Sequence, residues 1–454
     1  MSGARRGLIA LFLITLPLVT PRIRAADEIE YYSILRSAVL DGDLEFGNEY
    51  QHFYDRDPQG LQGFKETFLD RREPQSGRHI NFAPMGAALL WAPFFLATHG
   101  LVLLARALGS GVAADGYSWP YLASVSFASA LYAFLGLLLV HDALVRFGRF
   151  TDTVAGLAVA GLWLATPVLY YMTIAPGFGH APSLFAVALL TWLFLRAAAQ
   201  PAAVARDYFL IGLAGGLAGC VREQDVLFLA MPAALLAWRA LRSSAWLRSV
   251  GAGASLAAGA ALALVPQFVL YRSLTGGFGP SDLVKRKMTL SSPHLFEVLV
   301  DPGHGLFFWS PILLLATAGL VALAAKRREA AVAMLLVGLL LQFWINGSIE
   351  SWHMAGAFGS RRFVGATPVL AFGLAAVLAA LATRFGRGAA AAVVAVLVWW
   401  NLSLMVQFGL RLMDRQRLEW PRVATNQFTE VPRHALRAGV LFLTDRERLA
   451  KEGL

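Results

Sequence analysis

The chain has 454 residues, of which 57% are hydrophobic and only 15% are charged. A soluble domain of ordinary surface polarity cannot be packed from this composition, which indicates a polytopic integral membrane protein. The net charge of +10 comes from Lys and Arg residues scattered through short loops, whereas nucleic-acid binding requires a clustered basic face.

The N-terminal segment predicts a first membrane helix. Arg5 and Arg6 precede a long apolar run, a pattern that also suits a secretory signal peptide. The bulky Ile23 stands where a cleavage site needs a small residue, so we favour an uncleaved helix over a signal peptide. In both cases the loop that follows, at 24–118, faces the extracytoplasmic side.

The first loop opens with the acidic segment DEIEYYSILRSAVLDGDLEFGNEY. Apolar side chains recur here at helical spacing: Tyr31, Ile34, Leu35, Ala38 and Val39. Polar side chains fill the other face: Asp27, Glu30, Ser33, Ser37 and Asp41. We expect an amphipathic helix on the membrane surface, where its acids could meet both a lipid-borne and a polar substrate. A surface helix with solvated acids and no chemistry is the alternative.

The apolar segment at 83–105 could span the membrane, but the charges of the later loops argue against it. If it lies along the surface, every short inside loop is basic. If it spans, the inside receives a loop near Gly177 that has no basic residue. Pro84 and Pro93 also fit a kinked segment, so we expect a re-entrant or interfacial helix.

The other apolar runs predict about eleven crossings of roughly 30 Å of hydrocarbon. The expected spans are 7–23, 119–141, 154–173, 181–197, 208–221, 226–241, 250–271, 306–325, 330–346, 363–383 and 389–408. The fold class expected is thus an all-α polytopic membrane protein whose long first extracytoplasmic loop contains juxtamembrane helices. Residues 1–408 would form a single transmembrane domain, and residues 409–454 would form an extracytoplasmic tail.

Two stretches resemble a known superfamily. DEIEYY directly after the first membrane helix, followed by NFAPMGAALLWAPFF, resembles the GT-C glycosyltransferases, particularly the protein O-mannosyltransferases and the aminoarabinose transferases of lipid A. SWHMAGAFGSRRFVGATPVL resembles the pattern before a late helix in related bacterial membrane glycosyltransferases. The resemblance implies that an acid at this point of the first loop is catalytic and that the apolar helix after it is a juxtamembrane element.

The expected reaction is transfer of a sugar from a polyprenyl-phosphate-linked donor to an extracytoplasmic acceptor. The chain has no Gly-rich phosphate cradle for a nucleotide sugar. A phosphate leaving group needs little protonation, so one carboxylate acting as general base on the acceptor hydroxyl suffices. We predict Asp27 as that base, supported by Glu28. The sugar and the acceptor, whether protein, lipid or polysaccharide, stay open.

Cations on the extracytoplasmic side are candidates for binding the donor phosphate, because the arginine fork matches phosphate oxygens. They are Arg361, Arg362, Arg222, Lys285 and Arg286. Arg361 and Arg362 come first because they lie in the stretch that resembles the superfamily, with anchoring at lipid headgroups as the alternative. For Arg222 the alternative is an ion pair with Glu223 or Asp225.

Many GT-C enzymes carry a second acid after the third span, where this chain reads TIAPGFGHAPS and offers His180. His180 could replace that acid or merely cap the next helix, and Asp41 or Asp43 could supply a carboxylate by folding back. The DGD spacing could also ligate a divalent cation, so metal dependence is open. His353 could contact the sugar.

Two other classes of membrane protein compete with the transferase. A transporter or lipid flippase would place ionisable residues near the bilayer midplane, whereas here the apolar cores are nearly free of charge. A polysaccharide polymerase or ligase would use arginine and histidine in a large late loop. The Ala- and Arg-rich composition suggests a bacterial inner membrane protein with its site facing the periplasm.

Overall fold

The computed structural model describes residues 2–200, 204–242, 246–354, 356–446 and 448–449. Helices account for most of these residues, and no β-strand occurs within the described ranges. Two isolated β-bridges join Arg72 to His79 and Met288 to Ile349. The all-α fold class expected from the sequence is therefore confirmed.

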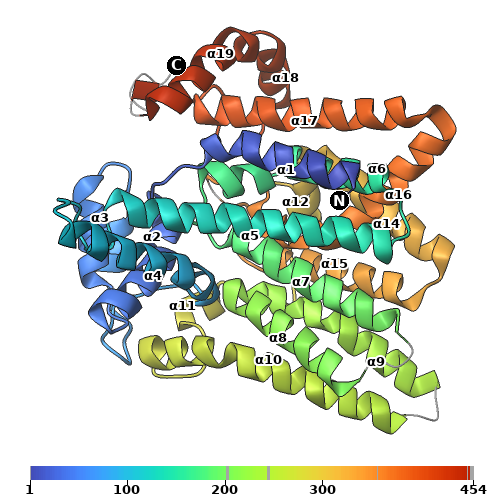
Figure 1. Ribbon diagram of the computed structural model, residues 1–454, viewed down its shortest axis with the longest axis horizontal. Helices are drawn as coiled ribbons and strands as arrows, with labels where there is room; N and C mark the ends of the chain where they lie inside the picture. The colour runs from blue at the N-terminus through green and yellow to red at the C-terminus, as the bar shows by residue number, and fades with distance from the viewer. Residues whose placement is uncertain (1, 201–203, 243–245, 355, 447, 450–454) are drawn as a thin grey trace.

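Long helices form a bundle (Figure 1). Their bounds are α1 Gly3–Thr15, α5 Trp119–Arg146, α6 Asp152–Leu164, α7 His180–Ala198, α8 Ala205–Val221, α9 Ala230–Arg242, α10 Trp246–Thr275, α14 Pro311–Arg327, α15 Ala330–Gly347, α16 Thr367–Phe385 and α17 Arg387–Gly409. Each predicted span contains helical residues, because each is an apolar run that can satisfy its backbone hydrogen bonds in lipid only within a helix.

The number of crossings stays a prediction. Within the described chain, eight helices are long and apolar enough to cross a membrane: α4 (Gly86–Ala107), α5, α7, α9 with the turn before it, α10, α15, α16 with the turn before it, and α17. The helices α1, α6, α8 and α14, which fall in the other expected spans, are shorter. α6 ends at Leu164 and a further turn, η4 (Tyr170–Ile174), continues its predicted span.

Glycines let the helices of the bundle approach closely. A side chain at Gly212 of α8 would place its Cβ 2.1 Å from the carbonyl oxygen of Leu256 in α10. Gly259 of α10 meets the carbonyl oxygen of Phe209 in α8 at the same distance. Close packing of small residues holds helices together in lipid, where no hydrophobic effect acts between them. This contact explains why the predicted span at 208–221 is rich in glycine.

The helix connections alternate between two ends of the bundle. α2 (Ala26–Arg36), α3 (Gly47–Arg56) and α4 lie at one end, and the junctions α5–α6, α9–α10, α14–α15 and α16–α17 lie at the other (Figure 1). Basic residues close the helices that run into these junctions: Arg146, Arg239, Arg242, Lys326, Arg327 and Arg384. The basic connections expected on the inside are therefore on the side opposite the first loop, as the positive-inside argument requires.

α2 differs from the helix expected in the first loop. Both of its faces are buried within the protein, including Glu30 and Ser33 of the face expected in water. The segment at 80–82 covers Glu30, whose Oε1 accepts a hydrogen bond from the Phe82 N–H at 2.6 Å. The prediction of an amphipathic helix lying on the membrane surface is wrong, because the segment at 80–82 of the same loop covers the polar face at Glu30.

α4 packs against α2, α5 and α8 at the end of the bundle that holds the first loop (Figure 1). Its inner face buries Trp91 against Tyr31 and Phe95 against Tyr32, both in α2. Exposed leucines cover the rest of its surface: Leu96, Leu101, Leu103 and Leu104. Its length would also permit a crossing, so its course along the membrane surface stays a prediction.

The C-terminal segment folds back onto the bundle. α18 (Trp420–Phe428) and α19 (Glu430–Thr444) pack against α17. The backbone N–H of Leu418 donates to the Pro302 carbonyl at 2.8 Å, and the Gln416 side chain accepts from the Gly356 N–H at 3.1 Å. The tail thereby supports the loops that lead to Arg361. The domain boundary at residue 408 stays a prediction.

Candidate active site

Asp27 and Arg361 form an ion pair at the centre of the candidate site. Asp27 lies in the first turn of α2, where the helix dipole favours a carboxylate. Its Oδ2 lies 2.8 Å from Nη1 of Arg361, the first residue of the turn η6 (Arg361–Ala366) before α16. The Asp27 side chain is 47% exposed, whereas that of Arg361 is 18% exposed and lies over the Phe178 ring. An incoming hydroxyl can therefore reach the carboxylate.

Two more arginines lie near this pair. The charge of Arg362 interacts with those of Arg361, Arg222 and Asp27. One terminal nitrogen of Arg362 donates to Ser351 Oγ at 3.2 Å, and the other is buried without a hydrogen-bond partner in the described structure. Three arginines that lie together, one of them with an unused hydrogen-bond donor, are complementary to an anion. A phosphate supplies the several acceptor oxygens that guanidinium groups need.

His180 holds Arg222. It is the first residue of α7 and is 1% exposed, enclosed by the rings of Tyr171 and Phe178. Nη1 of Arg222 lies 3.0 Å from Nδ1 of His180. An arginine can only donate, so Nδ1 accepts and the imidazole is neutral in this arrangement. His180 thus orients a phosphate-binding candidate, a role different from the base or metal ligand considered from the sequence.

Tyr31 also belongs to the site, although its helical spacing predicts a position on the apolar, lipid-facing side of the helix. Its ring is buried, and its hydroxyl lies 2.9 Å from the position that a Cβ on Gly179 would take. Burial raises the pKa of Tyr31, partly offset by the charge of Arg222, so the phenol keeps its proton. Phe178 was missed as well. Neither could be found from helical spacing, which records only the apolar character of the position.

Glu28 has a structural role. Its Oε2 accepts hydrogen bonds from the backbone N–H groups of Arg24 and Ala25, at 2.9 and 3.0 Å, and so closes the N-terminus of α2. The side chain is buried, and desolvation raises its pKa to about 7 against the opposing effect of these two hydrogen bonds. Glu28 fixes the first turn of α2 and therefore the position of Asp27.

The raised pKa of Glu28 predicts a pH dependence of stability. The folded protein binds this proton more tightly than the unfolded chain does, so the stabilisation is complete below about pH 4.5 and is lost as the pH rises through about 7. The loss amounts to about 3 kcal/mol at pH 8. Glu28→Gln keeps an acceptor oxygen and does not titrate, so the variant should gain stability over wild type between pH 5 and pH 8. Equal unfolding midpoints for both proteins across this range would contradict the assignment.

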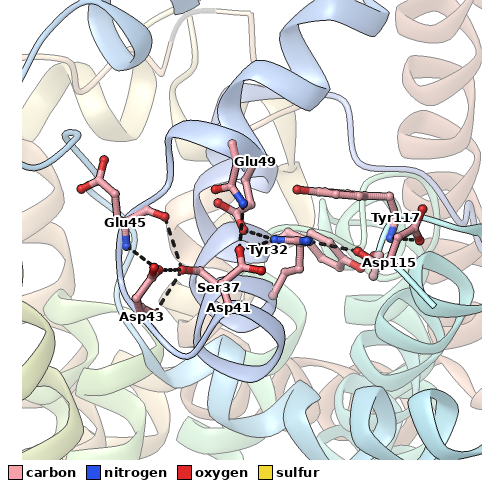
Figure 2. A network of polar contacts seen from close by, with 11 residues as sticks. Tyr32, Ser37, Asp41, Asp43, Glu45, Glu49, Asp115 and Tyr117 are labelled. Carbon is pink, nitrogen blue, oxygen red and sulfur yellow. Dashed lines mark hydrogen bonds and ion pairs between the residues drawn. The ribbon is translucent and has the colours of Figure 1, made fainter. Parts of the chain in front are cut away.

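Asp41 and Asp43 lie in a separate polar network of the first loop (Figure 2). Arg36 pairs with Asp41 and with Glu49, its Nη1 lying 2.6 Å from Glu49 Oε1, and its guanidinium lies over the Tyr117 ring. Asp43 accepts a hydrogen bond from Ser37 Oγ at 2.7 Å. These contacts hold the turn η2 (Ser37–Asp41) and α3 together. The carboxylates expected to fold back toward Asp27 are thus engaged elsewhere.

Arg36→Leu should destabilise the fold strongly, because Glu49 would stay buried without its cation. Breaking a buried ion pair from one side costs about 3–5 kcal/mol. The unfolding midpoint of the purified protein measures the loss, and adding Glu49→Leu should recover most of it. Arg72→Leu is the matched control, since the Arg72–Glu45 pair is exposed and such pairs contribute about 0–1 kcal/mol. A midpoint for Arg36→Leu as high as that of Arg72→Leu would refute this role.

The remaining candidates lie on the surface. Lys285 and Arg286 belong to the short exposed helix α11 (Asp282–Arg286), where Lys285 pairs with Asp282 at 2.8 Å. His353 is exposed and its ring meets Trp352 edge to face. Among the described residues, no hydrogen bond, ion pair or ring contact joins these three side chains to Asp27, so their part in the site stays a prediction. Exposure alone could not be read from the sequence, because all three residues occur in polar loops of similar composition.

Metal dependence stays open. In the described part of the chain, no group of three or more His, Cys, Asp or Glu side chains is arranged to hold a metal ion. The DGD carboxylates bind Arg36 and Ser37 instead.

Comparison with known proteins relates this architecture to solved structures. ArnT from Cupriavidus metallidurans bound to undecaprenyl phosphate matches with a TM-score of 0.51 and 16% identity, over 93% of this chain and 74% of that chain. The apo state of the same protein matches with a TM-score of 0.50 and 15% identity, over 94% of this chain and 75% of that chain. No protein-family model and no curated protein matches the sequence.

The helical bundle and the enclosed first loop define a polytopic integral membrane protein. The chain has the fold of ArnT, and this is the fold implied by the resemblance to the GT-C glycosyltransferases. The resemblance first seen in the DEIEYY and NFAPMGAALLWAPFF segments is thus confirmed at the level of fold over most of the chain.

Proposed function

We propose that the protein is a membrane glycosyltransferase that transfers a sugar from a polyprenyl-phosphate-linked donor to an extracytoplasmic acceptor. The observation that supports this function best is the half-exposed Asp27 carboxylate paired with Arg361, beside the further cations Arg222 and Arg362. The structural neighbour ArnT was solved with undecaprenyl phosphate, a lipid carrier of the kind that the proposed donor would release.

The arginines would receive the leaving group. As the acceptor oxygen attacks the anomeric carbon, the bond between this carbon and the phosphate oxygen breaks, and the bonding electrons leave with the polyprenyl phosphate. The additional negative charge develops on that oxygen. Arg361, Arg362 and Arg222 would stabilise it, because their guanidinium groups lie close enough for their charges to interact.

Asp27 would take the proton of the acceptor hydroxyl. A general base must lie within hydrogen-bond reach of that proton, and the exposed part of Asp27 leaves room for the acceptor. When the donor phosphate binds, Arg361 would share its donors between the phosphate and Asp27. The same arginine thus fixes the distance between base and leaving group, which is the main geometric requirement of a one-step displacement.

We also propose that the site faces the periplasm of a bacterial inner membrane. The first loop and η6 lie at the end of the bundle opposite the basic helix ends. Basic loops stay in the cytoplasm in bacterial membrane proteins. On that side no nucleotide sugar is present, which is consistent with a lipid-linked donor.

Binding of the lipid carrier tests the donor assignment before any acceptor is known. Undecaprenyl phosphate should raise the unfolding midpoint of the detergent-purified protein in a concentration-dependent manner, because a ligand of the folded state stabilises it. Arg361→Gln and Arg362→Gln should reduce this shift, whereas Arg286→Gln on the exposed α11 should not. No shift in wild type, or equal shifts in all four proteins, would overturn the assignment.

A further inference from the structure

A groove with a charged rim is lined by none of the candidate active-site residues. It lies between α1, α5 and α7 and has a volume of about 530 Å³. Six apolar side chains form its walls: Ile9, Leu135, Leu138, Leu139, Phe185 and Leu189. α5 and α7 both run from the first-loop end toward the opposite end, so the groove begins at Phe185, near the start of α7, and ends at Asp142, near the end of α5 and remote from Asp27.

The charged rim consists of Asp142 and the nearby Arg5, Arg146 and Arg196. This carboxylate accepts a hydrogen bond from Arg5, another from Arg146 Nε at 3.0 Å and a third from the Trp192 indole at 2.9 Å. The guanidinium of Arg196 lies 5.7 Å from the centre of the Trp192 ring. Arg5 and Arg146 therefore bind the carboxylate and Arg196 lies over the neighbouring Trp192 ring, which leaves a net charge of about +2 on Asp142 and the three arginines at neutral pH.

The arginines retain capacity for a further anion. Arg146 is 64% exposed and Arg5 is 36% exposed at the side chain. Each guanidinium has five N–H donors, and Asp142 engages only part of them. The excess positive charge stands where the walls of the groove end, at the depth of the basic helix termini. A molecule that fits must be anionic at one end and apolar along its length.

We propose that this groove binds a membrane phospholipid with an anionic headgroup, in the leaflet opposite the candidate active site. The phosphate would lie on Arg5, Arg146 and Arg196, and one acyl chain would fill the groove between α1, α5 and α7. The groove opens on the surface of membrane-spanning helices, where acyl chains are the molecules at hand. The net positive rim selects an anionic headgroup over a zwitterionic one.

The bound lipid joins the first helix to the rest of the bundle. Arg5 and Ile9 come from α1, whereas the opposite wall comes from α5 and α7. α1 leads directly into the segment that carries Asp27, so a lipid in this groove would hold in place the helix that precedes the catalytic candidate. This binding site is independent of the proposed transfer reaction and can be tested without an acceptor or donor.

Native mass spectrometry of the detergent-purified full chain tests the proposal, with phosphatidylglycerol and phosphatidylcholine of identical acyl chains as probes. Wild type should bind phosphatidylglycerol more tightly. The double variant Arg5→Gln with Arg146→Gln should lose at least about tenfold in affinity for phosphatidylglycerol, since one charge-assisted hydrogen bond already contributes that much. Arg384→Gln removes an exposed charge from the same end of the bundle and should leave both affinities unchanged.

A second variant tests the groove without changing its charge. Leu135 is 38% exposed, so Leu135→Trp can be accommodated and would occupy the volume meant for the acyl chain. It should weaken binding of phosphatidylglycerol, whereas Val321→Trp, on the exposed surface of α14, should not. Equal affinities of wild type for the two lipids, or wild-type binding of phosphatidylglycerol by both the double arginine variant and Leu135→Trp, would overturn the proposal.

Discussion

Asp27→Asn should reduce sugar transfer by about a thousandfold, within the range that general-base catalysis contributes. Asparagine keeps the size of the side chain and an oxygen that can accept from Arg361, so α2 and η6 should stay in contact. It cannot accept the proton of the acceptor hydroxyl. The initial rate with saturating donor and acceptor is the quantity to measure, since the loss should fall on kcat rather than on KM.

The matched control for this variant is Asp55→Asn. Asp55 lies on α3 in the same loop, and its carboxylate accepts a hydrogen bond from Gln51 on the exposed surface. The Asp55→Asn variant should transfer sugar at the wild-type rate. A rate for Asp27→Asn within about threefold of wild type would exclude Asp27 as the base, because a lost general base costs far more.

Arg361→Lys should lower transfer by about a hundredfold, although the charge is kept. Lysine offers a point charge in place of the planar fork that can contact the phosphate and Asp27 together. In the structure, Arg361 holds Asp27 at 2.8 Å and packs over Phe178. The variant should therefore bind the donor more weakly and also align the base less well, so both KM and kcat should change.

Arg286→Lys is the control for this substitution, because Arg286 is exposed on α11. It should behave as wild type. The thermal stability of the variants should also be compared, since Arg361 is largely buried and its loss could disturb η6. If Arg361→Lys is folded and fully active, the arginine does not receive the leaving phosphate, and Arg222 or Arg362 would have to take that role.

The helical bundle could be predicted because its signal is local. Each apolar run must form a helix in lipid, and the basic residues at the helix ends separate the two sides. The course of α2 could not be predicted in the same way. Its polar face is covered by the segment at 80–82, and the sequence around Glu30 contains no sign of that contact.

The site could be predicted only in part. Asp27, Arg361, Arg362, Arg222 and His180 were each identified as candidates, and the structure brings them together. Their pairing depends on tertiary contacts between segments far apart in the chain. The role of Glu28 as a cap of α2 could be recognised only from the hydrogen bonds that it accepts from the backbone of Arg24 and Ala25.

Tyr31 shows the limit of reading a helix by its spacing. Its apolar character suited a face buried in lipid as well as a face buried against another segment of the protein. Because Gly179 has no side chain, the loop before α7 can approach the Tyr31 hydroxyl, and this approach brings the ring to the site. A glycine in a polar turn does not reveal its contact before the fold is known.

The measurement that tests the central claim most directly is transfer of a radiolabelled sugar in proteoliposomes that contain the purified protein. Polyprenyl-phosphate sugars and nucleotide sugars should be supplied in parallel, with cell-envelope extract as the source of acceptors. We expect a labelled product with a polyprenyl-phosphate sugar and none with the nucleotide sugars. Label transferred from a nucleotide sugar alone, or from neither donor class, would contradict the account.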